Sequence, residues 1–209
     1  MIESLGYLIS SHIGYEAPRE RLLASMRDLP ITNVVIGGYN LRSGYYRSGV
    51  AHISADHNSY DYTALIDFVE HPADYPDWSH VFLLHDTMEL GPNADRLIRA
   101  VDPQWPAVAV WGGQCNLGLY RADYVRQCLP QLLGLKNCSK AYAVEMEGFL
   151  WTQLPKDERG VYGGTIEVSE EYPVYGGAPR RREYYTAVDV TKYKANWGQP
   201  TPPGGVVTP

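Results

Sequence analysis

Short apolar runs alternate with amphipathic segments along the first two-thirds of the chain. The runs that predict buried strands are 5–9, 32–36, 50–54, 80–85 and 107–111. Segments with apolar residues at helical spacing lie between or after these runs and predict helices. These segments are 17–26, 61–69, 93–101, 122–133 and 139–151, with Asp61 and Asn93 as expected N-caps. The run 80–85 is apolar almost throughout, which is typical of a strand covered on both faces.

This alternation predicts an α/β fold with a mostly parallel central sheet and helices on both faces. After Pro155 the pattern changes, and 161–168, 171–175 and 184–190 read as short strands, which predicts a smaller mixed β region near the C-terminus. Residues 200–209 contain four Pro and two Gly. They predict an extended tail or a linker to a further domain, so we expect 1–199 to form one domain.

Charge and cysteine content exclude several classes of protein. The 209 residues include 18 Lys and Arg against 24 Asp and Glu, a net charge of −6, which argues against nonspecific binding to nucleic acid or anionic membranes. The three cysteines form no C-x-x-C pair, so neither a disulfide scaffold nor a structural zinc site is expected. With no signal-peptide pattern and no apolar stretch of roughly 20 residues, we expect a cytoplasmic protein without a membrane span.

Several familiar catalytic motifs are absent from the sequence. It contains no G-x-x-x-x-G-K-[ST] loop, no G-x-G-x-x-G after the first strand, no G-x-S-x-G and no H-E-x-x-H. These absences argue against nucleoside triphosphatases, nicotinamide dehydrogenases, α/β-hydrolases and zinc proteases.

Clusters of polar residues follow the predicted strands at 10–12, 37–40, 56–58, 85–89 and 112–116. Ligands of open α/β sheets bind in the crevice beyond the carboxyl ends of the strands. The coincidence therefore predicts that these clusters surround one ligand site.

Two acids follow the most apolar strand directly. Asp86 and Glu89 stand at its end, where an acid is costly to desolvate unless a cation or hydrogen-bond donors offset the cost. Carboxylate oxygens suit Mg²⁺ and Mn²⁺, and such an ion would hold a diphosphate. From the residues alone, a turn capped by Asp86 with Glu89 in solvent is an equally open reading.

The acidic strand end, the order of elements and the opening segments 8–12 and 34–38 resemble glycosyltransferases of the GT-A fold. The resemblance covers roughly residues 5–195. It implies that Asp86 and Glu89 bind Mn²⁺ or Mg²⁺ in the place of a D-x-D motif, although this pair has one extra spacer. It also implies a nucleotide-diphosphate sugar, UDP-linked, as donor.

The same resemblance implies roles for further residues. A general base would be Glu147, with Glu145 in reserve. Residues expected to bind the donor are Ser10, Ser11, His12, Gly37, Asp56, Asn58, Asp61, Trp111, Lys192 and Lys194. Each also has a structural reading, such as turn capping, core packing of Trp111 or a solvated charge.

The sequence therefore predicts a glycosyltransferase that moves a sugar from a nucleotide-diphosphate donor to a hydroxyl group of a glycan or glycoconjugate. A sugar-phosphate nucleotidyltransferase is one alternative, although 10–14 lacks the glycine-rich basic loop usual after the first strand of such enzymes. A non-catalytic module that binds nucleotide sugars is the other.

Overall fold

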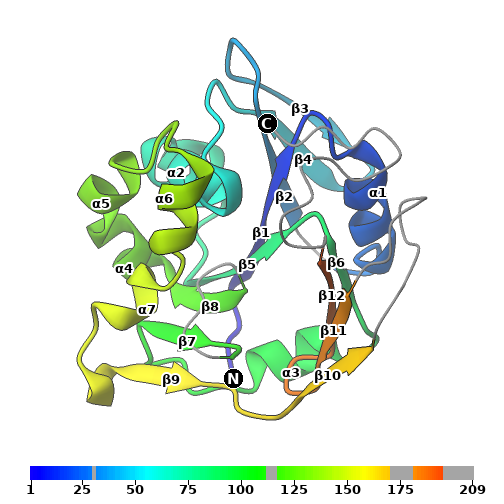
Figure 1. Ribbon diagram of the computed structural model, residues 1–209, viewed down its shortest axis with the longest axis vertical. Helices are drawn as coiled ribbons and strands as arrows, with labels where there is room; N and C mark the ends of the chain where they lie inside the picture. Colours follow the sequence, from blue (N-terminus) through cyan, green and yellow to red (C-terminus); the bar gives the residue numbers. More distant parts are fainter. Residues whose placement is uncertain (30–31, 112–116, 170–180, 195–209) are drawn as a thin grey trace.

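A computed structural model describes residues 1–29, 32–111, 117–169 and 181–194. Its larger sheet has eight strands in the order β3-β4-β2-β1-β5-β8-β7-β9 (Figure 1). The strands are β1 (Leu5–His12), β2 (Thr32–Gly37), β3 (Ser43–Arg47), β4 (Val50–Ser54), β5 (His80–His85), β7 (Ala107–Ala109), β8 (Gly118–Arg121) and β9 (Arg159–Val161). The four neighbours β4, β2, β1 and β5 run parallel, whereas β3 and β8 are antiparallel to the strands beside them.

Helices cover both faces of this sheet, as the alternation predicts (Figure 1). They are α1 (Glu16–Ser25), α2 (Thr63–Glu70), α3 (Ala94–Arg99), α4 (Ala122–Gln127), α5 (Leu129–Leu133), α6 (Lys140–Glu145) and α7 (Phe149–Thr152). Leu8 of β1 packs in the same core cluster as α2 and α4 to α7. Its neighbours Tyr7 and Ile9 pack with α1 and α3, so the central strands are buried on both faces.

The smaller sheet confirms the predicted small β region near the C-terminus, but the strand bounds differ. Its antiparallel order is β10-β11-β12-β6, and it packs on the α1 side of the core (Figure 1). The strands are β6 (Met88–Leu90), β10 (Ile166–Ser169), β11 (Arg181–Tyr185) and β12 (Val190–Lys194). The predicted strand 161–168 covers the end of β9, a connection and most of β10, and 184–190 covers the turn between β11 and β12. Because β6 begins shortly after β5 ends, the smaller sheet stands directly beside the carboxyl end of β5.

Some predicted boundaries are wrong. The polar segment 10–12 is part of β1, because β2 pairs with all three residues and β5 also pairs with Ser10. The segment 39–49, in which no element was predicted, contains β3. The predicted helices at 122–133 and 139–151 are each split into two short helices. Predicted elements at 112–116, 171–175 and 200–209 lie outside the described residues.

Short helices complete the described chain: η1 (Tyr60–Tyr62), η2 (Pro72–Asp74) and η3 (Lys156–Glu158). Within the described ranges, no helix has the length and apolar character that crossing a membrane requires.

Candidate active site

The carboxyl ends of the parallel strands lie at one edge of the larger sheet. Ser10 is opposite both Val35 and His85, and His12 is opposite Gly37. Ile36 is in turn opposite Ser54, the last residue of β4. The predicted clusters at 10–12, 37–40 and 85–89 therefore meet at this edge, as expected.

Asp86 is the most perturbed acid of this edge. Its side chain is 6% exposed, and its Oδ2 accepts a hydrogen bond of 2.9 Å from the Ser11 hydroxyl. The pKa of Asp86 is raised to about 7, chiefly by burial, and the nearby charge of Asp61 contributes to the rise. The Ser11 hydrogen bond and the charge of Arg19 oppose this rise. The strand end thus holds a carboxyl group that lacks full compensation for its charge.

Arg19 brings a positive charge to the same place, and the sequence reasoning missed it. Its Nη1 donates to Ser11 Oγ at 3.2 Å and to the carbonyl oxygen of His12 at 3.4 Å. The residue lies in the first turns of α1, immediately after β1. A basic residue at the start of the helix that follows the first strand was the signal available in the sequence.

Ser10 holds the start of α2 in place. Its hydroxyl donates to the carbonyl oxygen of Asp61 at 2.8 Å and accepts from the amide of Ala64 at 3.0 Å. The prediction that Asp61 caps this helix is therefore wrong, because a serine from a neighbouring strand takes the capping role and the residue before α2 makes no side-chain cap. The carboxylate of Asp61 instead contributes negative charge near Asp86.

The loop after β4 packs closely on the end of β2. A Cβ added at Gly37 would lie only 2.8 Å from the carbonyl oxygen of His57, so this glycine permits the contact. Asn58 is held by Asn137, whose Oδ1 accepts from the Asn58 amide at 3.0 Å. Asp56 lies 3.7 Å from the ammonium group of Lys136. The loop thus shapes the edge of the site through backbone and side-chain contacts of its own.

Glu89 has partners other than Asp86. It forms an ion pair with Arg21 of α1, and its Oε2 accepts a hydrogen bond of 2.6 Å from the Tyr193 hydroxyl. The carboxylate therefore ties β6 to α1 and β12. Among the described residues, no group of three or more His, Cys, Asp or Glu side chains is arranged to hold a metal ion. The pairing of Glu89 with Asp86 as metal ligands stays a prediction without support from these contacts.

Buried charges line one face of the smaller sheet. Met88, Lys192 and Glu183 are register partners across β6, β12 and β11, so their side chains share a face. Lys192 is 5% exposed and Glu183 is 3% exposed. Glu183 accepts hydrogen bonds from the Tyr185 hydroxyl at 2.8 Å and from Arg181 Nε at 2.9 Å. Burial of a lysine and a glutamate beside the strand end marks this face as a candidate part of the site.

Glu147 lies within electrostatic range of that cluster. It is half-buried in the turn between α6 and α7. The pKa of Tyr185 is raised above its usual range by burial first, then by its hydrogen bond to Glu183, and the charge of Glu147 adds to the rise. Tyr62 of η1 donates to the carbonyl oxygen of Met146 at 2.5 Å, which joins this turn to the segment that carries Asp61. By contrast, Glu145 is exposed at the end of α6.

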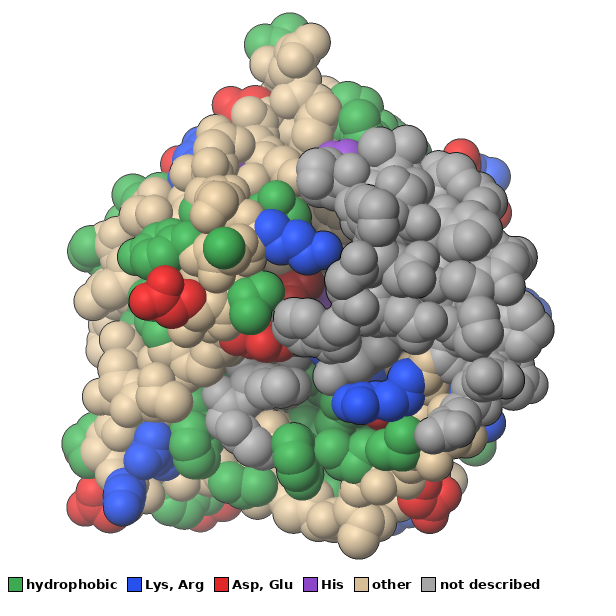
Figure 2. All heavy atoms as spheres, in the orientation of Figure 1, with side chains coloured by type: hydrophobic (Ala, Val, Ile, Leu, Met, Phe, Trp, Pro, Cys, Tyr) green, Lys and Arg blue, Asp and Glu red, His purple; other side chains and the backbone are tan. Residues whose placement is uncertain are grey.

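In Figure 1, β1 and β5 lie near the middle of the view, with α6 and α7 to the left and with α1 and the smaller sheet to the right. Figure 2 shows the same orientation, and acidic and basic side chains lie close together near the centre of this face.

No family model matches the sequence, and a search of curated proteins found no match. Solved structures that resemble the chain include glycosyltransferases. The glycosyltransferase GlyE of Streptococcus pneumoniae TIGR4 matches with a TM-score of 0.49 and 12% identity over 77% of this chain and 45% of its own. A glycosyltransferase involved in glycosylation of the PBCV-1 major capsid matches with a TM-score of 0.48 and 9% identity, over 76% of this chain and 81% of its own.

The galactosyltransferase LgtC, solved with donor and acceptor sugar analogues, matches with a TM-score of 0.44 and 10% identity, over 75% of this chain and 72% of its own. This chain thus spans less than half the length of GlyE.

Two further predicted residues, Trp111 and Lys194, lie at or just after the end of a strand. Trp111 follows β7 and is 51% exposed, so the alternative that it packs in the core is wrong. Lys194 is the last residue of β12, and its side chain lies outside the described part of the chain. Glu183, like Arg19, was missed, because the charged run 180–182 beside it reads as a solvated sheet edge.

Proposed function

We propose that the protein transfers a sugar from a nucleotide-diphosphate donor, UDP-linked, to a hydroxyl group of a glycan or glycoconjugate. One observation carries the proposal: the buried carboxyl group of Asp86, with a pKa of about 7, stands at the carboxyl end of the central parallel strands. A buried acid without full compensation at the ligand edge of an α/β sheet is typical of a functional site.

Asp86 fits a divalent cation better than Glu89 does. Mg²⁺ is commonly bound through one or two carboxylates together with substrate phosphates, so a cage of three protein ligands is not required. Asp86 would hold the ion, with the charge of Asp61 nearby, whereas Glu89 is engaged by Arg21. When bound, Mn²⁺ or Mg²⁺ supplies positive charge that stabilises the departing diphosphate.

Two fixed cations of the chain support the same role. Arg19 lies over the end of β1, and Lys192 is buried in β12 beside Met88 of β6. Charges that are positioned before the reaction stabilise a leaving group without reorganisation during it. Arg19 and Lys192, together with Lys194 of the same strand, would thus bind the diphosphate.

Glu147 would act as the general base. It would accept the proton of the acceptor hydroxyl while that oxygen attacks the anomeric carbon and the bond from this carbon to the diphosphate oxygen breaks. Glu147 is half-buried near Tyr185, whereas Glu145 is exposed, and this difference favours Glu147.

The neutral polar groups of the strand ends would bind the nucleoside. Ser11 and His12 would contact the base or ribose, and Trp111 would offer an exposed ring to the donor sugar. In this arrangement Ser10, Gly37 and Asn58 contribute by holding the loops around the nucleotide, as their contacts indicate.

A thermal-shift screen with UDP-, GDP-, dTDP- and CMP-sugars, each with and without Mn²⁺, tests the proposal. A ligand specific to the native state at a hundredfold excess over Kd stabilises it by about 2.7 kcal/mol. We expect one nucleotide class to stabilise the protein in the presence of Mn²⁺ and to lose this effect in Asp86→Ala. The exposed Asp28→Ala serves as the matched control. Absence of any shift across the panel would contradict the proposal.

Product analysis then separates the competing activities. Release of free nucleoside diphosphate with acceptor-dependent loss of the donor indicates glycosyl transfer. Formation of nucleotide sugar and pyrophosphate from a sugar phosphate and a nucleoside triphosphate would indicate a nucleotidyltransferase. Binding without turnover would indicate a non-catalytic module.

A further inference from the structure

A pocket lies at the β3 edge of the larger sheet, apart from the residues of the candidate active site. Its volume is about 430 Å³, within the usual range for small-molecule sites. It is lined by Arg42, Gly44, Tyr46, Ala51, Ile53 and Asp74. Tyr45 and His52, which are register partners on the opposite face of the hairpin, complete the lining. Tyr46 is the register partner of Ala51, and Gly44 is that of Ile53, so these four share one face of the β3–β4 hairpin. Because Ile53 packs with the core residues of α2, this is the α2 side of the sheet.

Tyr46 presents an exposed ring that the hairpin holds in place. The residue is 71% exposed, yet its hydroxyl donates to the carbonyl oxygen of Gly49 at 3.0 Å. Ser48 and Gly49 form the turn with positive φ values of 52° and 81°, which is typical of a tight two-residue hairpin. A ring ordered before binding loses little conformational entropy when a ligand stacks on it.

The other end of the pocket carries a neutralised cation. Arg42 binds the buried Asp67 through Nε at 2.7 Å and Nη2 at 3.1 Å, and its Nη2 lies 2.7 Å from Asp74 Oδ2. Tyr75 also donates to Asp67 at 2.6 Å, which fixes this carboxylate. One guanidinium charge thus faces two carboxylates. Fixed donors and acceptors are present without net positive charge, which favours hydroxyl groups over phosphate or sulfate.

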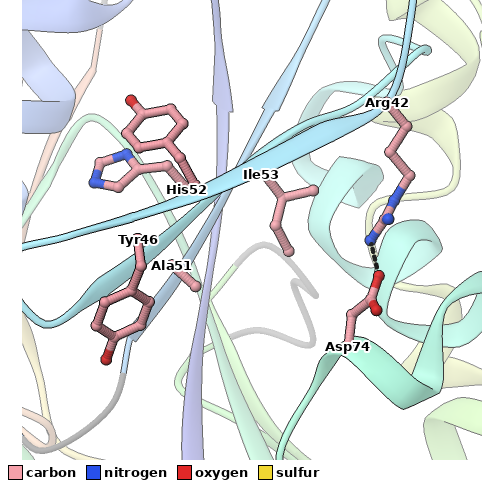
Figure 3. A pocket seen from close by; sticks show the side chains of 8 residues that line it. Arg42, Tyr46, Ala51, His52, Ile53 and Asp74 are labelled. Carbon is pink, nitrogen blue, oxygen red and sulfur yellow. Dashed lines mark ion pairs between the residues drawn. The ribbon is translucent and has the colours of Figure 1, made fainter.

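The apolar floor connects these two ends. In Figure 3, Ala51 and Ile53 lie between the Tyr46 ring and the Arg42–Asp74 ion pair. The pocket therefore combines an aromatic ring, a small apolar floor and a polar end without net positive charge. A sugar ring has matching surfaces, because its C–H face is apolar and its rim carries hydroxyl groups.

We propose that this pocket binds a neutral saccharide, with the sugar ring stacked on Tyr46 and its hydroxyl groups bonded to Arg42 and Asp74. The site would be a binding site only, with no chemical step. The pocket shares no residue with the candidate active site, so this proposal does not depend on the proposed transferase activity.

Titration of ¹⁵N-labelled protein with methyl glucoside, methyl galactoside, methyl mannoside and lactose at millimolar concentrations tests this proposal. We expect at least one of these neutral sugars to shift the amide resonances of 42–53 and of Asp74 in a saturable way. UDP should leave these resonances unchanged. If none of the four sugars shifts them, or if the shifts are confined to the strand ends around Asp86, the proposal is wrong.

Variants of Tyr46 sharpen the test. Loss of the ring in Tyr46→Ala should raise Kd about tenfold. Tyr46→Phe keeps the ring and loses only the hydrogen bond to Gly49, so its Kd should rise by a smaller factor. Tyr142, an exposed tyrosine on α6 that does not line the pocket, supplies the matched control Tyr142→Ala. Equal affinity of Tyr46→Ala and Tyr142→Ala would overturn the assignment. The amide spectrum of each variant also reports whether its fold is retained.

Discussion

Replacing Asp86 with asparagine should stabilise the ligand-free protein at neutral to alkaline pH. Burial raises the pKa of this carboxyl group from 3.8 to about 7. The native state therefore retains the Asp86 proton at pH values where the unfolded chain has lost it, and stability falls as the pH rises from about 4 to about 7. Each unit by which the pKa is raised corresponds to about 1.4 kcal/mol. Ionisation of Asp86 therefore lowers the free energy of unfolding by about 4 kcal/mol above pH 7. Asparagine avoids this loss and still accepts the Ser11 hydrogen bond.

The assay is urea unfolding of the parent and of Asp86→Asn across a pH series from about 4 to about 8. We expect equal stability near pH 4 and a widening advantage of the variant toward pH 8, up to the limit of about 4 kcal/mol. The exposed Asp28→Asn should follow the parent at every pH. If the variant is no more stable than the parent at pH 8, the inference that burial destabilises the ionised form of Asp86 is wrong. The same variant should also lose stabilisation by nucleotide sugar with Mn²⁺.

Three further substitutions test the remaining assignments. If Glu147 is the base, Glu147→Gln should lower kcat in a transfer assay on the order of 100-fold, whereas Glu145→Gln should stay within about twofold of the parent. Equal effects of the two substitutions would reject Glu147 as the base. Gly37→Ala places a Cβ 2.8 Å from the carbonyl oxygen of His57 and should cost about 1–3 kcal/mol in urea unfolding, so an unchanged midpoint would show that the loop yields freely. Glu89→Gln breaks the partly exposed ion pair with Arg21 and should lower the free energy of unfolding by at most about 1 kcal/mol. The apparent affinity for Mn²⁺ should stay unchanged, and a large loss of that affinity would indicate that Glu89 is a metal ligand.

The parts of the fold that follow from local pattern were predictable. The strand at 80–85 coincides with β5, because an unbroken apolar run is what a strand between two helical layers requires. The parallel strands β1, β2 and β4 and the meeting of their carboxyl ends follow from the same alternation. The segment 10–12 extends β1 because β2 pairs with all three residues and β5 with Ser10, and no local pattern encodes these pairings.

Pairing between distant segments was not predictable. β8 is a short antiparallel strand between β5 and β7, and its four residues carry no distinct periodic signal. Likewise, Glu183 is a charged residue of a kind that sequence patterns place in solvent. Glu183 and Lys192 are both buried because they lie on the face of the smaller sheet that packs against the core on the α1 side. Asp86 was singled out from the sequence because it directly follows a buried strand. Arg19 was missed, although it stands at the start of the helix that follows the first strand.

The three-residue strand β6 has a consequence for the order in which the protein is assembled. It pairs with β12, about a hundred residues later in the chain, and the Tyr193 amide also donates to the carbonyl oxygen of Thr87 at 2.8 Å. During synthesis from the N-terminus, β1, β2, β4 and β5 are available to pair long before residue 190 is made. The segment that follows Asp86 therefore gains its neighbour strand, and the buried Lys192, only when the last described strand arrives. A nascent chain would contain Asp86 early and Lys192 late. These two residues therefore come together only at the end of folding.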